Sequence, residues 1–476
     1  MRPKQVLLVL LCCLFVPGAL HAQTTTQSTV DDQQAVEVTV YNSNLALVKD
    51  QRRIALPRGQ GELRFMNVAA HIRPETVYVE CLNHPDDFMV LEQNYEYDLM
   101  DYNKLLDKYV GKKMKIRDYN AYQDTTRMVD AVLLSNNNNQ PVYQIGDDIY
   151  LGYNGLRVLP TIPENLISKP TLMWLYDYAG RDKAEIEISY LTSNMNWKAD
   201  YILVLSKDDT RGNLAGWVTV DNKSGTPYKD AVLKLVAGEV NVVIPQRPQR
   251  HLMVMKEMGG ETNGAQFEEK GFFEYHIYDL QRPTTLKNNQ IKQISLLEAN
   301  GISVEKEYLV YGQRYYFTRQ YREENPKQPV NVNVKFQNAK DNKMGMPLPK
   351  GTIRMYKKDD DDKLQFVGED QIEHTPKDEE VTLKVGEAFD ITAERKQTDY
   401  RQLTTRLHES EWEITLKNHK EKAVVVSVVE PVYGNWSVVN SSHPYTKKDA
   451  FTLRFDVPVR PDEEVRVTYR LRVGLE

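Results

Sequence analysis

Short segments in which apolar and polar residues alternate dominate this chain. Residues 184–190 read AEIEISY and residues 465–473 read VRVTYRLRV, so that every second side chain is apolar. A period of two, with many β-branched and aromatic residues, is typical of half-buried antiparallel strands. The same alternation occurs in residues 36–42, 332–336, 381–385, 412–418 and 451–457. Many short strands of this kind predict a mainly β fold made of antiparallel β-sandwich domains.

One segment has a helical pattern instead. Leu105, Leu106 and Tyr109 recur at helical spacing, and Asp101 precedes them as a suitable N-cap. Short strands with tight turns follow at once, and we expect them to close as a small five-strand barrel. The helix and these strands predict a β-barrel-like domain over residues 100–165, inserted into a larger sandwich.

Breaks in the alternation divide the rest of the chain. Residues 246–271 mix Pro, Gly, Met and Glu without a strand pattern, which is typical of a mobile loop or linker. Residues 23–35 are polar and without periodicity, which is typical of a flexible leader. The predicted division is a signal peptide at 1–22, the leader at 23–35, an N-terminal β-sandwich formed by 36–99 and 166–245, the inserted domain at 100–165, the linker at 246–271, and a C-terminal β-sandwich at 272–476.

The N-terminus has the features of a secretory signal peptide. Arg2 and Lys4 precede a short apolar run that ends at Pro17, and Ala22 offers a small residue for cleavage. The run is shorter than the roughly 20 residues that span a membrane. We therefore expect an exported protein without a transmembrane segment in the mature chain. The periplasm is the expected location, and an extracellular or outer-membrane-associated location is the alternative.

Composition narrows the class of protein. The chain has 41% hydrophobic and 27% charged residues, as ordinary globular proteins do. Its formal net charge is −6 and its acids and bases are interspersed. A nucleic-acid binder would need a concentrated basic face, so we expect no nucleic-acid partner. Cys81 is the one cysteine after residue 22, which excludes an intramolecular disulfide in the mature chain.

Common catalytic signatures are missing from the sequence. It contains no His-Glu-x-x-His zinc motif, no Gly-x-Ser-x-Gly nucleophile turn and no glycine loop for phosphate. We therefore predict no catalytic, cofactor-binding or metal-ligating residue and no cofactor. A hydrolase that uses two carboxylates far apart in sequence is the alternative, because such a pair leaves no local motif.

The run KKDDDDKLQF at residues 357–366 places four adjacent aspartates between lysines. A calcium loop of the EF-hand type that starts at Asp359 would need glycine at its sixth position, which is Leu364. Strand-like segments flank the run. We therefore predict a hairpin tip with solvated acids, and weak calcium binding is the alternative.

Residues 272–297 contain the densest group of aromatic and charged side chains. Such side chains are frequent in binding surfaces because they stack and form hydrogen bonds at low entropic cost. The alternative is a strand whose aromatics are core and whose charges are solvated. The candidate interaction surface consists of Glu274, Tyr275, His276, Tyr278, Arg282 and Lys287.

Long stretches of the chain, such as VTVYNSNLALVKDQRRIALPRGQGELRF, GWVTVDNKSGTPYKDAVLKLVAGEVN and RPTTLKNNQIKQISLL, resemble the bacterial domain-of-unknown-function 4139 family. That family is related to proteins of the mucoidy inhibitor A type, although this chain lacks their central coiled-coil stretch. The resemblance implies a link to exopolysaccharide or the cell envelope and offers no catalytic residues. We expect an envelope-associated, non-enzymatic binding or structural module whose partner is an envelope protein or polysaccharide. The alternative is a hydrolase or binder that acts on envelope polysaccharide.

Overall fold

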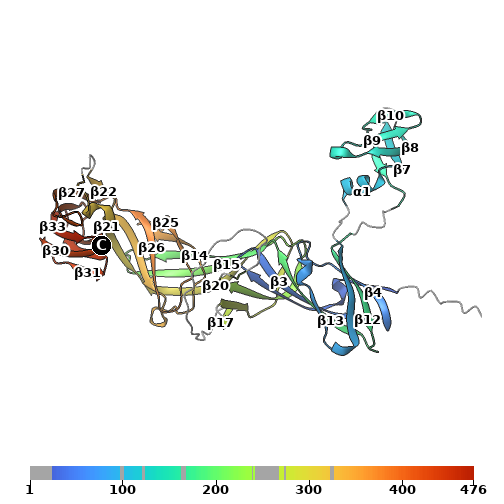
Figure 1. Ribbon diagram of the computed structural model, residues 1–476, viewed down its shortest axis with the longest axis horizontal. Coiled ribbons are helices and arrows are strands. Elements are labelled where there is room, and N and C mark those ends of the chain that lie inside the picture. Colours follow the sequence, from blue (N-terminus) through green and yellow to red (C-terminus); the bar gives the residue numbers. More distant parts are fainter. Residues whose placement is uncertain are drawn as a thin grey trace, which may run out of the picture. The chain divides into compact units, whose positions relative to one another are not determined.

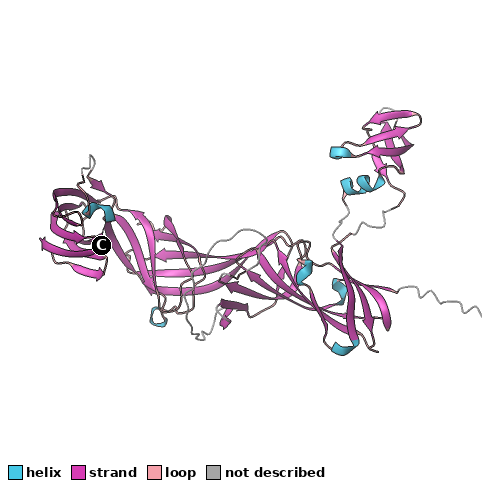
Figure 2. Ribbon diagram, viewed as in Figure 1, coloured by secondary structure: helices cyan, strands magenta, loops and turns pink. Residues whose placement is uncertain are grey.

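The protein is mainly β (Figure 1), which confirms the predicted fold class. The computed structural model describes residues 24–96, 101–120, 124–161, 168–238, 240–241, 267–272, 275–321 and 326–475. In this part of the chain α1 (Tyr102–Tyr109) is the one α-helix, beside strands and short 3-10 turns (Figure 2). None of the described helices is long and apolar enough to cross a membrane.

Two compact units make up the chain, one within residues 1–36 and 48–191 and the other within 37–47 and 192–476. The chain passes between them inside β2 (Gln33–Tyr41), β3 (Leu45–Ile54) and β13 (Ala184–Ser193). In the first unit a four-stranded sheet has the order β1-β4-β12-β6, and β13 pairs with β5. Their bounds are β1 (Thr25–Ser28), β4 (Gly59–Met66), β5 (Tyr78–Cys81), β6 (Phe88–Glu96), β12 (Thr171–Tyr178) and β13 (Ala184–Ser193).

The polar leader predicted over residues 23–35 is ordered from β1 onward, so the prediction of flexibility is wrong there. β1 pairs in parallel with β4. The fully buried Arg52 guanidinium donates to the Ser28 carbonyl at 3.1 Å and forms a 2.8 Å ion pair with Asp50. It also lies 3.6 Å above the Phe65 ring. Backbone pairing and one buried cation hold this segment. Neither contact requires apolar side chains in the segment itself, so its sequence shows no apolar alternation.

Arg52→Met is expected to detach the leader from its sheet. The Ser28 carbonyl loses this donor, and the buried Asp50 carboxylate loses its cation while it keeps a 2.9 Å hydrogen bond from Gln33. An unsatisfied buried group costs about 1–3 kcal/mol. Limited proteolysis with mass detection should show faster cleavage between residues 24 and 33 than in the unmodified protein. The control is Arg53→Met, whose side chain is 56% exposed; equal cleavage of both variants would contradict the role of Arg52.

The predicted helix is confirmed as α1, and a five-stranded antiparallel sheet follows it in the order β10-β9-β8-β7-β11. Asp101 caps the helix by accepting a 3.0 Å hydrogen bond from the Lys104 amide. Leu106 and Tyr109 of the helix share a core with Ile116, Leu133 and other residues of the sheet. The strands are β7 (Lys113–Asn120), β8 (Thr125–Ser135), β9 (Val142–Ile145), β10 (Asp148–Leu151) and β11 (Leu156–Val158).

In the second unit, strands far apart in sequence form common sheets. One sheet has the order β20-β15-β14-β24-β25, and β16 pairs with β18, β19 and β2. The predicted division grouped residues 166–245 with the N-terminal sandwich, whereas β14 and β15 pair with strands beyond residue 272. The strands are β14 (Met195–Leu205), β15 (Arg211–Asn222), β16 (Tyr228–Ala237), β17 (Phe267–Phe272), β18 (Tyr275–Leu280), β19 (Thr284–Leu286), β20 (Gln290–Ser303), β24 (Gly351–Lys358) and β25 (Leu364–Ile372). Most of the predicted linker at 246–271 lies outside the described residues.

The aspartate run forms a hairpin tip, as predicted, because β24 and β25 pair in antiparallel register on either side of it. The Asp359 carboxylate accepts hydrogen bonds from the amides of Asp361 at 3.1 Å and Lys363 at 2.8 Å. It also accepts one from Gln365, and these bonds lower the pKa of Asp359. Asp359 thus stabilises the turn by accepting hydrogen bonds from the amides within it.

The C-terminal sandwich packs a six-stranded sheet, order β26-β23-β21-β29-β32-β31, against a five-stranded sheet, order β22-β27-β28-β33-β30 (Figure 1). Trp412, Phe455 and Tyr469 lie in the core between the two sheets. The strands are β21 (Glu305–Tyr311), β22 (Lys327–Gln328), β23 (Asn331–Gln337), β26 (Glu380–Glu387), β27 (Ile391–Gln402), β28 (Leu407–Asn418), β29 (Val424–Pro431), β30 (Asn435–Ser441), β31 (Thr446–Asp449), β32 (Thr452–Val459) and β33 (Glu464–Gly474).

Candidate functional site

The outer face of the six-stranded sheet carries two adjoining pockets. Successive side chains of a strand point to opposite faces, so residues that do not enter the sandwich core line the outer face. The corner pocket, of about 370 Å³, is lined by Ser303, Val304, Glu305, Lys335, Phe336, Gln337, Asp341, Asn342 and Glu380. The face pocket, of about 260 Å³, is lined by Glu307, Leu309, Tyr311, Asn333, Lys335, Glu380, Thr382, Val429, Lys448, Asp449, Thr452 and Arg454. Because both contain Lys335 and Glu380, we call the two pockets together the groove.

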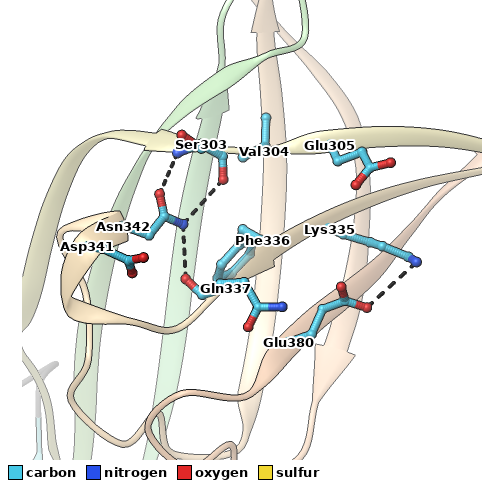
Figure 3. A pocket seen from close by; sticks show the side chains of 9 residues that line it. All are labelled: Ser303, Val304, Glu305, Lys335, Phe336, Gln337, Asp341, Asn342 and Glu380. Atoms are coloured by element: carbon cyan, nitrogen blue, oxygen red, sulfur yellow. Dashed lines mark hydrogen bonds and ion pairs between the residues drawn. The ribbon is translucent and has the colours of Figure 1, made fainter.

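Asn342 fixes one wall of the corner pocket. Its amide oxygen accepts from the Ser303 amide at 2.6 Å, and its amide nitrogen donates to the carbonyl of Gln337 at 2.9 Å (Figure 3). The 3-10 turn at Lys340–Asn342 is thereby tied to β20 and β23. A wall held by such bonds keeps its shape without a ligand, which lowers the entropic cost of binding.

A chain of ion pairs forms the floor of the groove. The Lys335 ammonium lies 2.7 Å from one oxygen of Glu307 and 3.6 Å from Glu380. The Arg454 guanidinium lies 3.1 Å from the other oxygen of Glu307 and 2.7 Å from Asp456. The side chains of Glu307, Lys335 and Arg454 are 8%, 15% and 18% exposed. These charges are therefore held in fixed positions by partners from neighbouring strands.

The electrostatics of this floor favour ionised carboxylates. Burial acts to raise the pKa of Glu307, but hydrogen bonds and charges from Lys335 and Arg454 outweigh it and lower that pKa. A general acid in a glycosidase needs the opposite shift, toward a higher pKa. Burial does raise the pKa of Glu430, with partial offset by Arg395, but that carboxyl is fully buried in the sandwich core. The groove thus presents charged hydrogen-bonding groups, and Glu307 is not suited to proton donation.

Tyr278, a member of the candidate interaction surface, is a core residue. Its side chain is 1% exposed, and its hydroxyl donates to the Pro347 carbonyl at 3.0 Å. Its ring contacts Trp197 with the centroids 6.2 Å apart. The prediction that Tyr278 lies on a binding surface is therefore wrong, because the alternating pattern of β18 directs it into the interior.

The other members of that surface are placed separately from the groove. Tyr275 and His276 are half-buried on β18, and Arg282 and Lys287 are exposed in the turns that flank β19. Glu274 lies outside the described residues. None of these side chains lines either pocket of the groove.

Sequence reasoning missed Glu307, Lys335 and Arg454. Each stands at a polar position of an alternating strand, where a solvated side chain is the ordinary expectation. Their meeting depends on β23 pairing with β21, and on β29 pairing with both β21 and β32. No spacing in the sequence signals those pairings.

No protein-family model matches this chain, and no curated protein matches it. The resemblance to the domain-of-unknown-function 4139 family therefore stays a prediction. Among the described residues, no group of three or more His, Cys, Asp or Glu side chains is arranged to hold a metal ion.

Proposed function

We propose that this protein is an exported, envelope-associated binding module and that its groove holds a polysaccharide without cleaving it. The observation that carries the proposal is the ion-pair floor formed by Glu307, Lys335 and Arg454. Charged groups form stronger hydrogen bonds than neutral ones, and fixed groups orient a ligand at low entropic cost. A hydroxyl-rich polymer can use many such donors and acceptors along its length.

The position of the groove favours a glycan over an extended peptide. Peptides that add to a sheet do so at an exposed edge, where backbone groups are unpaired. The groove lies over β21 and β23, which have paired strands on both sides, and its lining reaches the edge strands at Glu380 and Thr382 of β26 and at Lys448 and Asp449 of β31. Over these two paired strands the groove therefore offers side-chain donors and acceptors, which can bond the hydroxyls of a glycan.

Charge favours a neutral glycan over an acidic one. Carboxylates outnumber cationic groups in the lining, so a polyuronate would meet net repulsion. The lining carboxylates are Glu305, Glu307, Asp341, Glu380 and Asp449, and the cations are Lys335, Lys448 and Arg454.

Affinity electrophoresis of the purified protein through gels with dextran, pullulan, hydroxyethylcellulose or alginate tests the proposal. We expect at least one neutral polymer to retard the protein and alginate to have less effect. Glu380→Ala should weaken binding about 10- to 150-fold, because a hydrogen bond to a charged group contributes about 1.5–3 kcal/mol. Glu421→Gln is the control, because Glu421 is exposed in a turn and lines neither pocket.

Two results would overturn the proposal. Absence of retardation by every neutral polymer would remove the binding function. Release of new reducing ends from a bound polymer, lost in Glu380→Ala, would show a hydrolase instead.

A further inference from the structure

Two large aromatic side chains stand exposed on the C-terminal sandwich. Tyr433 is 58% exposed and Phe451 is 52% exposed. Their rings are nearly parallel, with an interplanar angle of 20° and centroids 5.8 Å apart. Rings with so much exposed apolar area are characteristic of binding sites when they occur together.

Hydrogen bonds hold the backbone segments that carry both rings. The Val432 amide donates to the Phe451 carbonyl at 2.7 Å, and the Phe451 amide donates to the Asp449 carboxylate at 2.7 Å. The Arg314 guanidinium lies 5.8 Å from the centroid of the Tyr433 ring. The backbone beneath the pair is thus fixed before a ligand binds, which lowers the entropic cost of binding.

Phe451 is adjacent in sequence to residues that line the groove. Phe451 lies between Asp449 and Thr452, which both line the face pocket. Tyr311, which is 45% exposed, also lines that pocket.

We propose that Tyr433 and Phe451 form an aromatic subsite that stacks against a sugar ring of the same neutral polysaccharide. The inference rests on the proposed function and extends it. The C–H face of a pyranose ring is apolar and matches the π face of an aromatic ring, while Arg314 supplies donors for hydroxyls at the rim.

The size of the pair argues against a protein partner. An aromatic side chain buries roughly 150–250 Å², so two half-exposed rings offer about 200 Å². A stable protein interface needs about 800 Å² from each partner. Two rings suit one or two sugar units.

The experiment uses the full protein with both Tyr433→Ala and Phe451→Ala. Its affinity is compared with that of the unmodified protein by affinity electrophoresis in the neutral polymer that retards the unmodified protein. We expect its dissociation constant to rise about tenfold. The control is Phe389→Ala, because Phe389 is 94% exposed and lines neither pocket. Phe451→Trp should retain affinity, since indole keeps a stacking face. The thermal midpoint of the double variant should stay unchanged, which separates lost stacking from unfolding.

The outcomes separate the two claims. If the unmodified protein binds a neutral polymer and the double variant binds it equally well, the aromatic subsite is overturned and the groove stands. If Phe389→Ala weakens binding as much as the double variant does, the subsite is overturned too. If no neutral polymer binds the unmodified protein, both claims fail.

Discussion

Glu430→Leu is expected to lower the free energy of unfolding of the C-terminal sandwich by about 3–5 kcal/mol, because it leaves a buried charge without its partner. Arg395 and Glu430 form a 2.6 Å ion pair, and both side chains are 0% exposed. The guanidinium also lies 5.2 Å from the Tyr316 ring centroid and 5.8 Å from that of Trp412. Without Glu430 these rings and the Tyr469 hydroxyl at 3.3 Å cannot neutralise it.

Hydrogen exchange measures this loss locally, which matters in a chain with more than one unit. Amides of β27 and β29, the strands that carry the pair, should lose protection. The double variant Arg395→Met with Glu430→Leu should recover most of the stability, because well-packed apolar side chains often replace a buried pair at little cost. A loss below about 1 kcal/mol in the single variant would show that the core tolerates an unpaired guanidinium.

Glu307→Gln is expected to destabilise the sandwich by about 1.5–3 kcal/mol at pH 7 and to cost much less in acid. The pKa of Glu307 is lowered in the folded protein. A carboxyl with a lowered folded pKa contributes stability above its unfolded pKa, about 4.3 for glutamate, and loses it as the pH falls through the folded value. The difference in the free energy of unfolding between Glu307→Gln and the unmodified protein should therefore have its full size above about pH 5 and become smaller below about pH 4.

Denaturant unfolding at pH 7, 5 and 3.5 tests this dependence. Glu305→Gln on the same strand is the matched control, because its side chain is exposed, and it should change stability little at any pH. A difference between Glu307→Gln and the unmodified protein that stays constant down to pH 3.5 would contradict the lowered pKa.

The position of the candidate site could not be predicted from local sequence. The density of aromatic residues at 272–297 predicted an interaction surface there, yet Tyr278 is buried against Trp197. The groove instead uses Glu307 and Lys335, whose local sequence does not differ from that of any half-polar strand. Aromatic content is a property of one segment, whereas a site on the face of a sheet is shared among several strands.

Local pattern was sufficient for the individual elements. The period of two located strands such as β13 and β33, the spacing of Leu105, Leu106 and Tyr109 located α1, and the aspartate run marked a hairpin tip. Each of these depends on which face of one segment is buried, or on the hydrogen bonds of one turn, and so can be read from neighbouring residues.

Tertiary structure alone decided which strands pair and which side chains meet. β14 pairs in parallel with β24, so that Ala199 lies opposite Gly351 across a long stretch of chain. Arg52 of β3 bonds the Ser28 carbonyl of the leader, and the floor of the groove depends on Lys335 and Arg454 reaching Glu307 from separate strands. Alternation identifies the buried face of a strand but carries no information about its partner. Pairing is chosen by the packing of the whole sheet, and the site follows from that choice.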